Sequence, residues 1–189
     1  MATNNISNHI ILLVCIAALT GCRSDSSDSY DAISVVTATF SCESGNIPLT
    51  GCWVTEQCAE AQDGDDKFLG YWIRGVHYFA QNGNVHNAHL HYNNDSCSGS
   101  PTEASIFPNF YPETYVETGT ETTNEGLEGH RITYTLDTTD YQAIYIITVE
   151  NKLCFSDNIV FGPNYGHYSA LGPVPTIDYN ECLLPISNF

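Results

Sequence analysis

Positive charge is scarce in this chain of 189 residues, which has 5 Lys and Arg against 22 Asp and Glu and a formal net charge of -17. So few cations cannot form the basic surface that a nucleic-acid backbone or an anionic lipid headgroup requires. We therefore expect no nucleic-acid partner. Hydrophobic residues make up 42% of the chain, which is enough for a folded core and excludes a disordered acidic tail.

Short catalytic and metal-binding motifs are also missing. The sequence contains no Cys-x-x-Cys, Gly-x-Ser-x-Gly or His-Glu-x-x-His pattern and no Gly-rich phosphate loop. These absences argue against zinc-ribbon and thioredoxin-like proteins and against a nucleophilic hydrolase. We expect a protein that is not an enzyme. Because catalytic groups need not be neighbours in sequence, a secreted hydrolase remains an alternative.

No apolar run reaches the roughly 20 residues that a helix needs to span a bilayer. The longest, residues 10–19, has the length of the apolar region of a signal peptide. It ends in Leu-Thr-Gly-Cys at 19–22, which resembles the lipobox of bacterial lipoproteins. The alternatives are an ordinary secretory signal cleaved near Ala18 and a hydrophobic first strand.

The lipobox resemblance implies cleavage after Gly21, a diacylglycerol group on Cys22 and attachment to the membrane through this N-terminal lipid. Arg23 follows the lipidated Cys, whereas Asp at that position retains enteric lipoproteins at the inner membrane. The resemblance therefore implies the bacterial cell envelope, at the outer membrane, on its periplasmic face or the cell surface. It divides the chain into a signal peptide (1–21), the acylated Cys with a flexible tether (22–33) and a folded domain (34–189).

Six cysteines remain in this folded domain, and an even number in an exported chain predicts disulfides. They are Cys42, Cys52, Cys58, Cys97, Cys154 and Cys182. Six cysteines allow fifteen pairings. We favour Cys58 with Cys97 and Cys154 with Cys182, because each pair closes a loop around strand-like runs, and this leaves Cys42 with Cys52.

Runs rich in Val, Ile, Thr, Tyr and Phe predict strands almost throughout the folded domain, and no window has the apolar spacing of an amphipathic helix. The expected strands are 34–40, 51–57, 68–79, 84–92, 114–118, 130–136 and 141–150, with short pieces near Ile159 and Ile177. About eight strands in one unit predict an all-β fold, a single antiparallel β-barrel stapled by disulfides. A β-sandwich is the alternative.

Gly51-Cys52-Trp53 is similar to the Gly-x-Trp signature of lipocalins, a family with outer-membrane lipoproteins among its bacterial members. The resemblance implies a barrel whose closed end is plugged by Trp53, with Arg131 as a candidate for the Arg that packs on that Trp. It also implies binding of an apolar or amphipathic small molecule, with an envelope partner protein as the other candidate. The ligand-binding candidates are Trp53, Tyr71, Phe79, Tyr92 and Tyr145.

The pair Asn82-Gly83 predicts a hairpin with a two-residue type I′ turn, which sets Gln81 opposite Asn84. With this register the mostly apolar face of the hairpin looks inward, and the second predicted hairpin (130–136 with 141–150) places a central strand at 143–147.

The first hairpin carries a group of histidines, and the predicted register puts His77 and His86 on one face and His89 and His91 on the other. His89 and His91 are two residues apart, so together they could chelate Zn²⁺ or Cu²⁺ with a third ligand from elsewhere. An envelope metal-binding protein is thus a further alternative. Hydrogen-bonded core or surface histidines are the simpler interpretation, so we expect no cofactor.

Acidic residues gather at two places. Asp63-Gly64-Asp65-Asp66 resembles a fragment of a calcium loop but lacks its alternating oxygen ligands, so we expect an acidic turn. Five glutamates between 113 and 128 lie among Thr and Gly, and we expect a solvated loop there.

Overall fold

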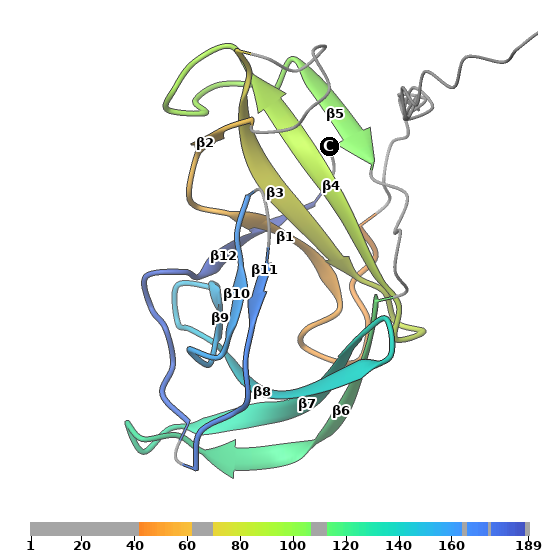
Figure 1. Cartoon of the computed structure of the whole chain (residues 1–189), viewed down its shortest axis with the longest axis vertical. Coiled ribbons are helices and arrows are strands. Elements are labelled where there is room, and N and C mark those ends of the chain that lie inside the picture. The colour runs from red at the N-terminus through yellow and green to blue at the C-terminus, as the bar shows by residue number, and fades with distance from the viewer. Residues whose placement is uncertain (1–41, 62–69, 107–112, 164–165, 174, 188–189) are drawn as a thin grey trace, which may run out of the picture. The chain divides into compact units, whose positions relative to one another are not determined.

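A computed structural model describes residues 42–61, 70–106, 113–163, 166–173 and 175–187, and Figure 1 shows their arrangement. The predicted signal peptide, the tether, the strand at 34–40 and the acidic turn at 63–66 lie outside these residues. Within the described residues, no helix is long and apolar enough to cross a membrane.

The described residues form twelve β-strands and no helix, which confirms the all-β prediction. The strands are β1 (Gly51–Thr55), β2 (Ala59–Glu60), β3 (Trp72–Phe79), β4 (Val85–Tyr92), β5 (Glu103–Ile106), β6 (Glu113–Thr122), β7 (Glu128–Leu136), β8 (Thr139–Ile147), β9 (Leu153–Phe155), β10 (Ile159–Phe161), β11 (Gly166–Tyr168) and β12 (Leu183–Ile186).

Ten strands form one antiparallel sheet in the order β5-β4-β3-β1-β12-β9-β8-β7-β6, with β2 paired to β3. The strands β10 and β11 pair only with each other. The predicted second hairpin is confirmed as β7–β8, and β8 is an inner strand with Ala143, Ile144 and Tyr145 fully buried. Among the strands that the structure describes, the sheet is not closed into a barrel, because β5 and β6 are its two edges.

At one corner, however, the edge strand β6 comes close to the turn between β3 and β4. Asn84 and Thr114 form an isolated antiparallel bridge, and the Tyr115 N–H donates to the Gly83 carbonyl over 2.7 Å. Figure 1 shows β6, β7 and β8 curving away below β3 and β4. The curved sheet therefore has an inner face, which we define as the face that carries Phe79 and Ile132.

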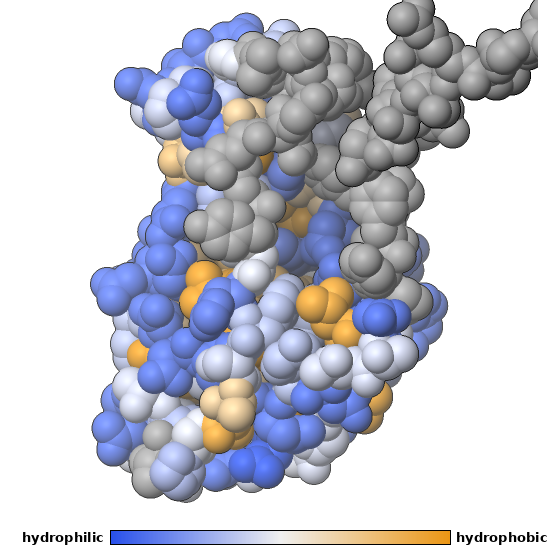
Figure 2. Space-filling model, viewed as in Figure 1, coloured by the Kyte–Doolittle hydropathy of each residue, from blue (hydrophilic) through white to orange (hydrophobic). Residues whose placement is uncertain are grey.

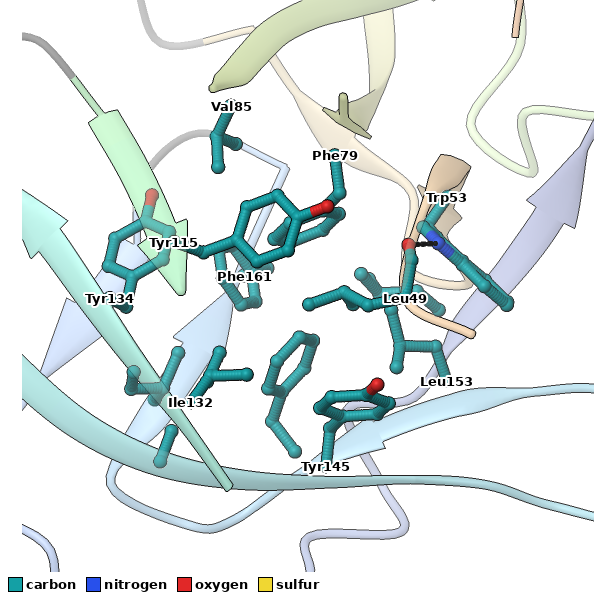
Figure 3. Close-up of a cluster of buried hydrophobic side chains, with 14 residues drawn as sticks. Leu49, Trp53, Phe79, Val85, Tyr115, Ile132, Tyr134, Tyr145, Leu153 and Phe161 are labelled. Carbon is teal, nitrogen blue, oxygen red and sulfur yellow. Dashed lines mark hydrogen bonds between the residues drawn. The ribbon is translucent and has the colours of Figure 1, made fainter. Parts of the chain in front are cut away.

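The main core lies on this inner face, where aromatic rings from several strands meet. Figure 3 shows Phe79, Tyr115, Tyr134, Tyr145 and Phe161 gathered there. Phe161 reaches the cluster from β10, and its ring centroid lies 5.7 Å from that of Phe79 and 5.6 Å from that of Tyr134. The β10–β11 pair thus covers the inner face and contributes to the same core.

Three disulfides join the pairs Cys42–Cys52, Cys58–Cys97 and Cys154–Cys182, with Cα–Cα distances of 5.3, 5.6 and 4.3 Å. This is the pairing that the sequence predicts. The first two lie in a second apolar cluster together with Val76, Ala88 and Leu90, whose side chains project from the face opposite Phe79. The sheet is therefore stabilised by buried side chains on both faces.

The predicted register of the β3–β4 hairpin is wrong by one residue. The Ala80 N–H donates to the Asn84 carbonyl and the Gly83 N–H donates to the Ala80 carbonyl, each over 2.9 Å. The loop therefore has three residues, a turn followed by a bulge in which Gly83 takes a φ of 87°. Phe79 now pairs with Val85. One extra loop residue moves every later side chain of β4 to the other face.

The strand expected at 114–118 is confirmed but is longer than expected, because β6 comprises Glu113–Thr122. The solvated loop expected for the glutamates is therefore wrong for Glu113, Glu117 and Glu121. Its register against β7 shifts between Glu117 and Gly119, which indicates a bulge. A spacing of four would place Glu113, Glu117 and Glu121 on one face, but the bulge reverses the alternation. Glu117 consequently faces inward, and Glu121 faces outward.

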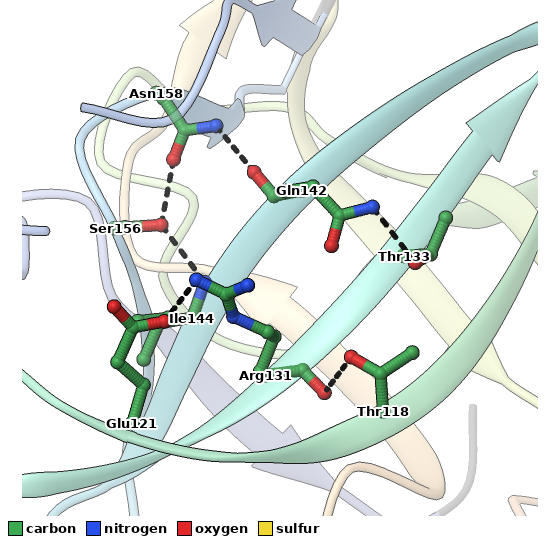
Figure 4. A network of polar contacts seen from close by, with 8 residues as sticks. All are labelled: Thr118, Glu121, Arg131, Thr133, Gln142, Ile144, Ser156 and Asn158. Carbon is green, nitrogen blue, oxygen red and sulfur yellow. Dashed lines mark hydrogen bonds and ion pairs between the residues drawn. The ribbon is translucent and has the colours of Figure 1, made fainter. Parts of the chain in front are cut away.

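On the outer face, Glu121 forms an ion pair with Arg131, and Figure 4 shows this contact beside Ile144. Arg131 therefore points away from the cluster that holds Trp53, so it does not pack on that indole. The Trp53 Nε1–H instead donates to the Leu49 carbonyl over 2.8 Å. The role expected for Arg131 is wrong, because neighbouring residues on a strand face opposite ways and Ile132 occupies the inner face.

Candidate functional site

The corrected register gathers three histidines on the inner face of the β3–β4 hairpin. His77 pairs with Asn87, Gly75 with His89, and Ile73 with His91, so all six side-chain positions share one face. His86 is alone on the opposite face, where its ring stacks on Tyr78. The register predicted from the sequence, which is shifted by one residue, places His77 on the face opposite the other two.

A chain of hydrogen bonds starts at His77 and ends at Tyr134. His77 Nδ1 lies 2.7 Å from Asn87 Oδ1, and Asn87 Nδ2 donates to both carboxylate oxygens of Glu113 over 2.9 Å. The Tyr134 hydroxyl also donates to Glu113. Burial raises the pKa of Tyr134 well above its usual range, so the hydroxyl keeps its proton.

This chain fixes the tautomer of His77. An ionised Glu113 only accepts hydrogen bonds, so the Asn87 NH₂ group must face it and the Asn87 carbonyl oxygen must face His77. His77 Nδ1 is then the protonated nitrogen, and Nε2 holds a lone pair. Burial lowers the pKa of His77 to about 4, although the Asn87 hydrogen bond opposes the shift. The ring is consequently neutral at pH 7.

His77 Nε2 is buried, and no hydrogen-bond partner reaches it among the described residues. The side chain as a whole is 9% exposed. Nε2 lies close to Gly75, 3.4 Å from where a Cβ on that glycine would sit. The carbonyl oxygen of Gly162 and the Cα of Pro163 lie 3.1 and 3.2 Å from the same point.

His89 contacts the same loop. Its side chain is hydrogen bonded to the backbone of Pro163, and because proline has no N–H, the imidazole must donate to the carbonyl oxygen. Burial lowers the pKa of His89 to about 3, with smaller contributions from the nearby His91 and His77. Two neutral imidazoles therefore neighbour Gly75, His77 on the same strand and His89 directly across the ladder.

His91 completes the row. Its Nε2 lies 2.7 Å from the Ser105 hydroxyl, and its ring packs edge-on against Tyr71. The centroids of the His89 and His91 rings are 6.3 Å apart. Among the residues that the structure describes, no group of three or more His, Cys, Asp or Glu side chains is arranged to hold a metal ion, so the third ligand expected for His89 and His91 is not identified.

A second inner-face carboxylate was missed by the sequence analysis. Glu117 accepts from the Tyr145 hydroxyl over 2.9 Å and lies 3.0 Å from His130 Nδ1. Burial raises the pKa of Tyr145, so its hydroxyl stays a donor. The strand expected at 114–118, together with the spacing of four between Glu113 and Glu117, could have predicted that these two side chains share a face.

The five ligand-binding candidates are not brought together around one space. Trp53, Phe79 and Tyr145 are packed within the main core, at 5%, 0% and 0% exposure. Tyr92 belongs to the second cluster, and Tyr71 lies beside His91. These aromatic side chains stabilise the fold. Trp53, Phe79 and Tyr145 are packed against other core side chains, so their rings are not exposed to a ligand.

No protein-family model, curated protein or solved structure matches this chain.

Proposed function

We propose that the chain is a bacterial lipoprotein, anchored in the outer membrane through Cys22, whose folded domain binds another protein of the cell envelope without catalysing a reaction. The observation that supports export is the complete pairing of the six domain cysteines. Disulfides persist in oxidising compartments such as the periplasm. This pairing leaves no domain cysteine to bond with Cys22, which therefore stays available for lipid.

A protein partner is favoured over a small apolar ligand because of where the aromatic residues lie. The candidates Trp53, Phe79 and Tyr145 serve the packed core. A net charge of -17 also favours partners with a basic surface, because it steers cationic surfaces toward the domain and repels anionic headgroups. Binding through the outer surface of the domain is consistent with both features.

We also propose that the curved sheet is an open form of the expected lipocalin-like barrel. The bridge between Asn84 and Thr114 brings β6 to the β3–β4 turn at one corner. The β10–β11 pair covers part of the inner face between the two edges. A barrel-derived shape would explain why Trp53 of β1 packs within the main core, as the Gly-x-Trp resemblance implies.

The lipid anchor can be tested with two cysteine variants in cells fed a radioactive fatty acid. The parent and a Cys15→Ser variant should be labelled and retained in the membrane fraction. A Cys22→Ser variant should be unlabelled and recovered in the soluble fraction. If Cys22→Ser is labelled and retained like the parent, the anchor is wrong.

The partner can be tested by photo-crosslinking in intact cells from the large hydrophobic side chains that the structure leaves exposed. These are Val116, Leu127, Val149 and Tyr179. At least one position should give a product of defined mass that is lost in the Cys22→Ser variant. Absence of such a product at all four positions, together with a stoichiometric apolar compound extracted from the purified protein, would favour the small-molecule alternative instead.

A further inference from the structure

The outer face of the sheet, opposite the inner face, carries an apolar cluster that is almost fully buried. Val76 on β3 and Leu90 on β4 are 1% and 2% exposed, and Val54 on β1 belongs to the same cluster. A sheet face that meets water is usually polar, and apolar side chains on it lose contact with water only when a further layer covers them. A layer of chain therefore lies over β1, β3 and β4.

The residues that the structure describes supply little of this layer. The apolar members of the cluster that lie outside the strands, among the described residues, are the disulfide-bonded Cys42, Cys58 and Cys97. Arg74 projects from the same face of β3, and its Nε is also buried, with no hydrogen-bond partner among the described residues. Three small side chains cannot cover three strands, so most of the layer comes from residues outside the described ranges.

The chain that precedes Cys42 ends at this face. Its strand-like run, 34–40, lies outside the described residues, but a disulfide fixes the place where it ends. Cys42 is bonded to Cys52, whose side chain belongs to the outer-face cluster, and the two Cα atoms are 5.3 Å apart. The six residues from Cys42 back to Val36 can span up to about 20 Å when extended. Neighbouring strands are about 4.8 Å apart, so this length is enough to cross β3 and β4 from β1.

The sequence of this segment alternates in step with its anchor. Apolar and hydroxyl-bearing side chains follow one another in the order Val36, Thr37, Ala38, Thr39, Phe40 and Ser41. The apolar residues are an even number of positions from Cys42, and side chains two apart point to the same side of an extended chain. Because Cys42 is directed at the sheet, an extended segment would turn its apolar side chains to the outer face and its hydroxyl groups to water.

We propose that residues 36–40 lie extended across the outer face of β1, β3 and β4 and cover the apolar cluster there. The run at 107–112, which follows β5 and is also aromatic, is the competing occupant, but it has neither a disulfide at this face nor the alternation. The docked segment would direct the lipid on Cys22 away from the outer face and turn that face toward the membrane. This last consequence rests on the proposed function, whereas the docking does not.

The segment offers a matched pair for the test, because Val35 and Val36 are identical neighbours that point to opposite sides. In the full chain in detergent, Val36→Asp should lower the denaturant concentration at the unfolding midpoint, since it places a carboxylate against apolar side chains. Val35→Asp should leave the midpoint unchanged. Phe40→Asp and Thr39→Asp repeat the comparison beside the disulfide. Equal shifts within both pairs would overturn the proposal.

A measurement on the parent protein avoids dependence on variants that fold poorly. Nuclear Overhauser contacts should connect the ring protons of Phe40 with the methyl groups of Val76 and Leu90. Absence of these contacts would overturn the proposal, whether the methyl groups contact the rings of 107–112, a second protein molecule or water instead. The Cys22→Ser variant should show the same contacts as the parent, so a failure of the lipid anchor and a failure of the docking are seen separately.

Discussion

The hairpins β3–β4 and β7–β8 both contribute to the inner face, but the side chains from β3–β4 are mostly polar and those from β7–β8 are mostly apolar or aromatic. Ile132 and Tyr134 on β7 and Ala143 and Tyr145 on β8 are all fully buried. On β3–β4 Phe79 and Val85 are the cross-strand pair of this face in which both residues are apolar and fully buried, and beyond it the face carries three histidines and Asn87 with Gly75 and the buried Ile73.

This difference indicates that the inner face of β3–β4 is not optimised for packing alone. Burying a polar side chain costs free energy unless its hydrogen bonds are made. One nitrogen of His77 lacks a partner among the described residues, whereas the polar ends of Tyr134 and Tyr145 both reach a carboxylate. We therefore place the candidate site on β3–β4 and assign β7–β8 to stability.

The largest expected effect comes from the residue that joins both hairpins. Phe161 contacts Phe79 on β3 and Tyr134 on β7. Phe161→Ala would leave a cavity between them and should lower the free energy of unfolding by about 3–5 kcal/mol. Denaturant unfolding measures this. Tyr179→Ala, at a half-exposed position, is the control and should change little; equal loss in both variants would show that Phe161 does not join the hairpins.

Acid should destabilise the β3–β4 side through its buried imidazoles. The pKa of His77 is lowered from 6.5 to about 4, and that of His89 from 6.5 to about 3. Below pH 6.5, and down to these lowered values, the unfolded chain therefore binds more protons than the folded chain. Stability present above pH 6.5 is then lost as the pH falls toward 4 and below. For His77 the loss is roughly 3 kcal/mol.

Unfolding midpoints measured in metal-free buffer between pH 7.5 and 4 would check this. A His77→Gln variant should lose part of the pH dependence, and His167→Gln, at an exposed position, should keep all of it. If His77→Gln and the parent have parallel curves, the imidazole of His77 is not buried as a neutral group.

A smaller loss of stability is expected from removing Asn87, which connects His77 on β3 to Glu113 on β6. Asn87→Ala removes the donor to Glu113 and the acceptor for His77. It should lower the free energy of unfolding by about 1–3 kcal/mol, because it leaves buried polar atoms without partners. Thermal or denaturant unfolding measures it. Asn82→Ala, in the exposed turn of the same hairpin, is the control.

The smallest effect should come from the β7–β8 side. Tyr145→Phe removes only the hydroxyl that donates to Glu117 and leaves the ring in the core, so we expect a loss of about 1 kcal/mol. Denaturant unfolding beside the Asn87→Ala variant measures the contrast. A larger loss for Tyr145→Phe than for Asn87→Ala would mean that polar contacts matter more on β7–β8, and the comparison of the two hairpins would fail.

Much of the fold could be predicted from local patterns. Alternating β-branched and aromatic residues identified β1, β3, β4, β7 and β8, and the loop-closing spacing led to the three disulfide pairs. The register of β3–β4 could not be predicted, because Asn82-Gly83 fits both a two-residue turn and a three-residue turn with a bulge. The Gly83 contact with Tyr115, distant in sequence, accompanies the second form.

The site was predicted only in part for the same reason. The histidines were recognised as a group, but their faces depend on that one loop residue. The short strands β9 and β12 carry too few residues for a periodic signal, and the bulge in β6, which no local pattern predicts, turns Glu121 to the face opposite Glu117. Packing between segments far apart in sequence decides these features.

The position of β12 has a consequence for how the chain reaches this fold. β12 pairs with β1 on one side and β9 on the other, so the strand nearest the C-terminus joins the β5-to-β1 half of the sheet to the β9-to-β6 half. The two halves cannot form one continuous sheet until this last strand is available. Such non-local pairing slows folding, and it keeps the sheet incomplete until residues 183–186 have been delivered.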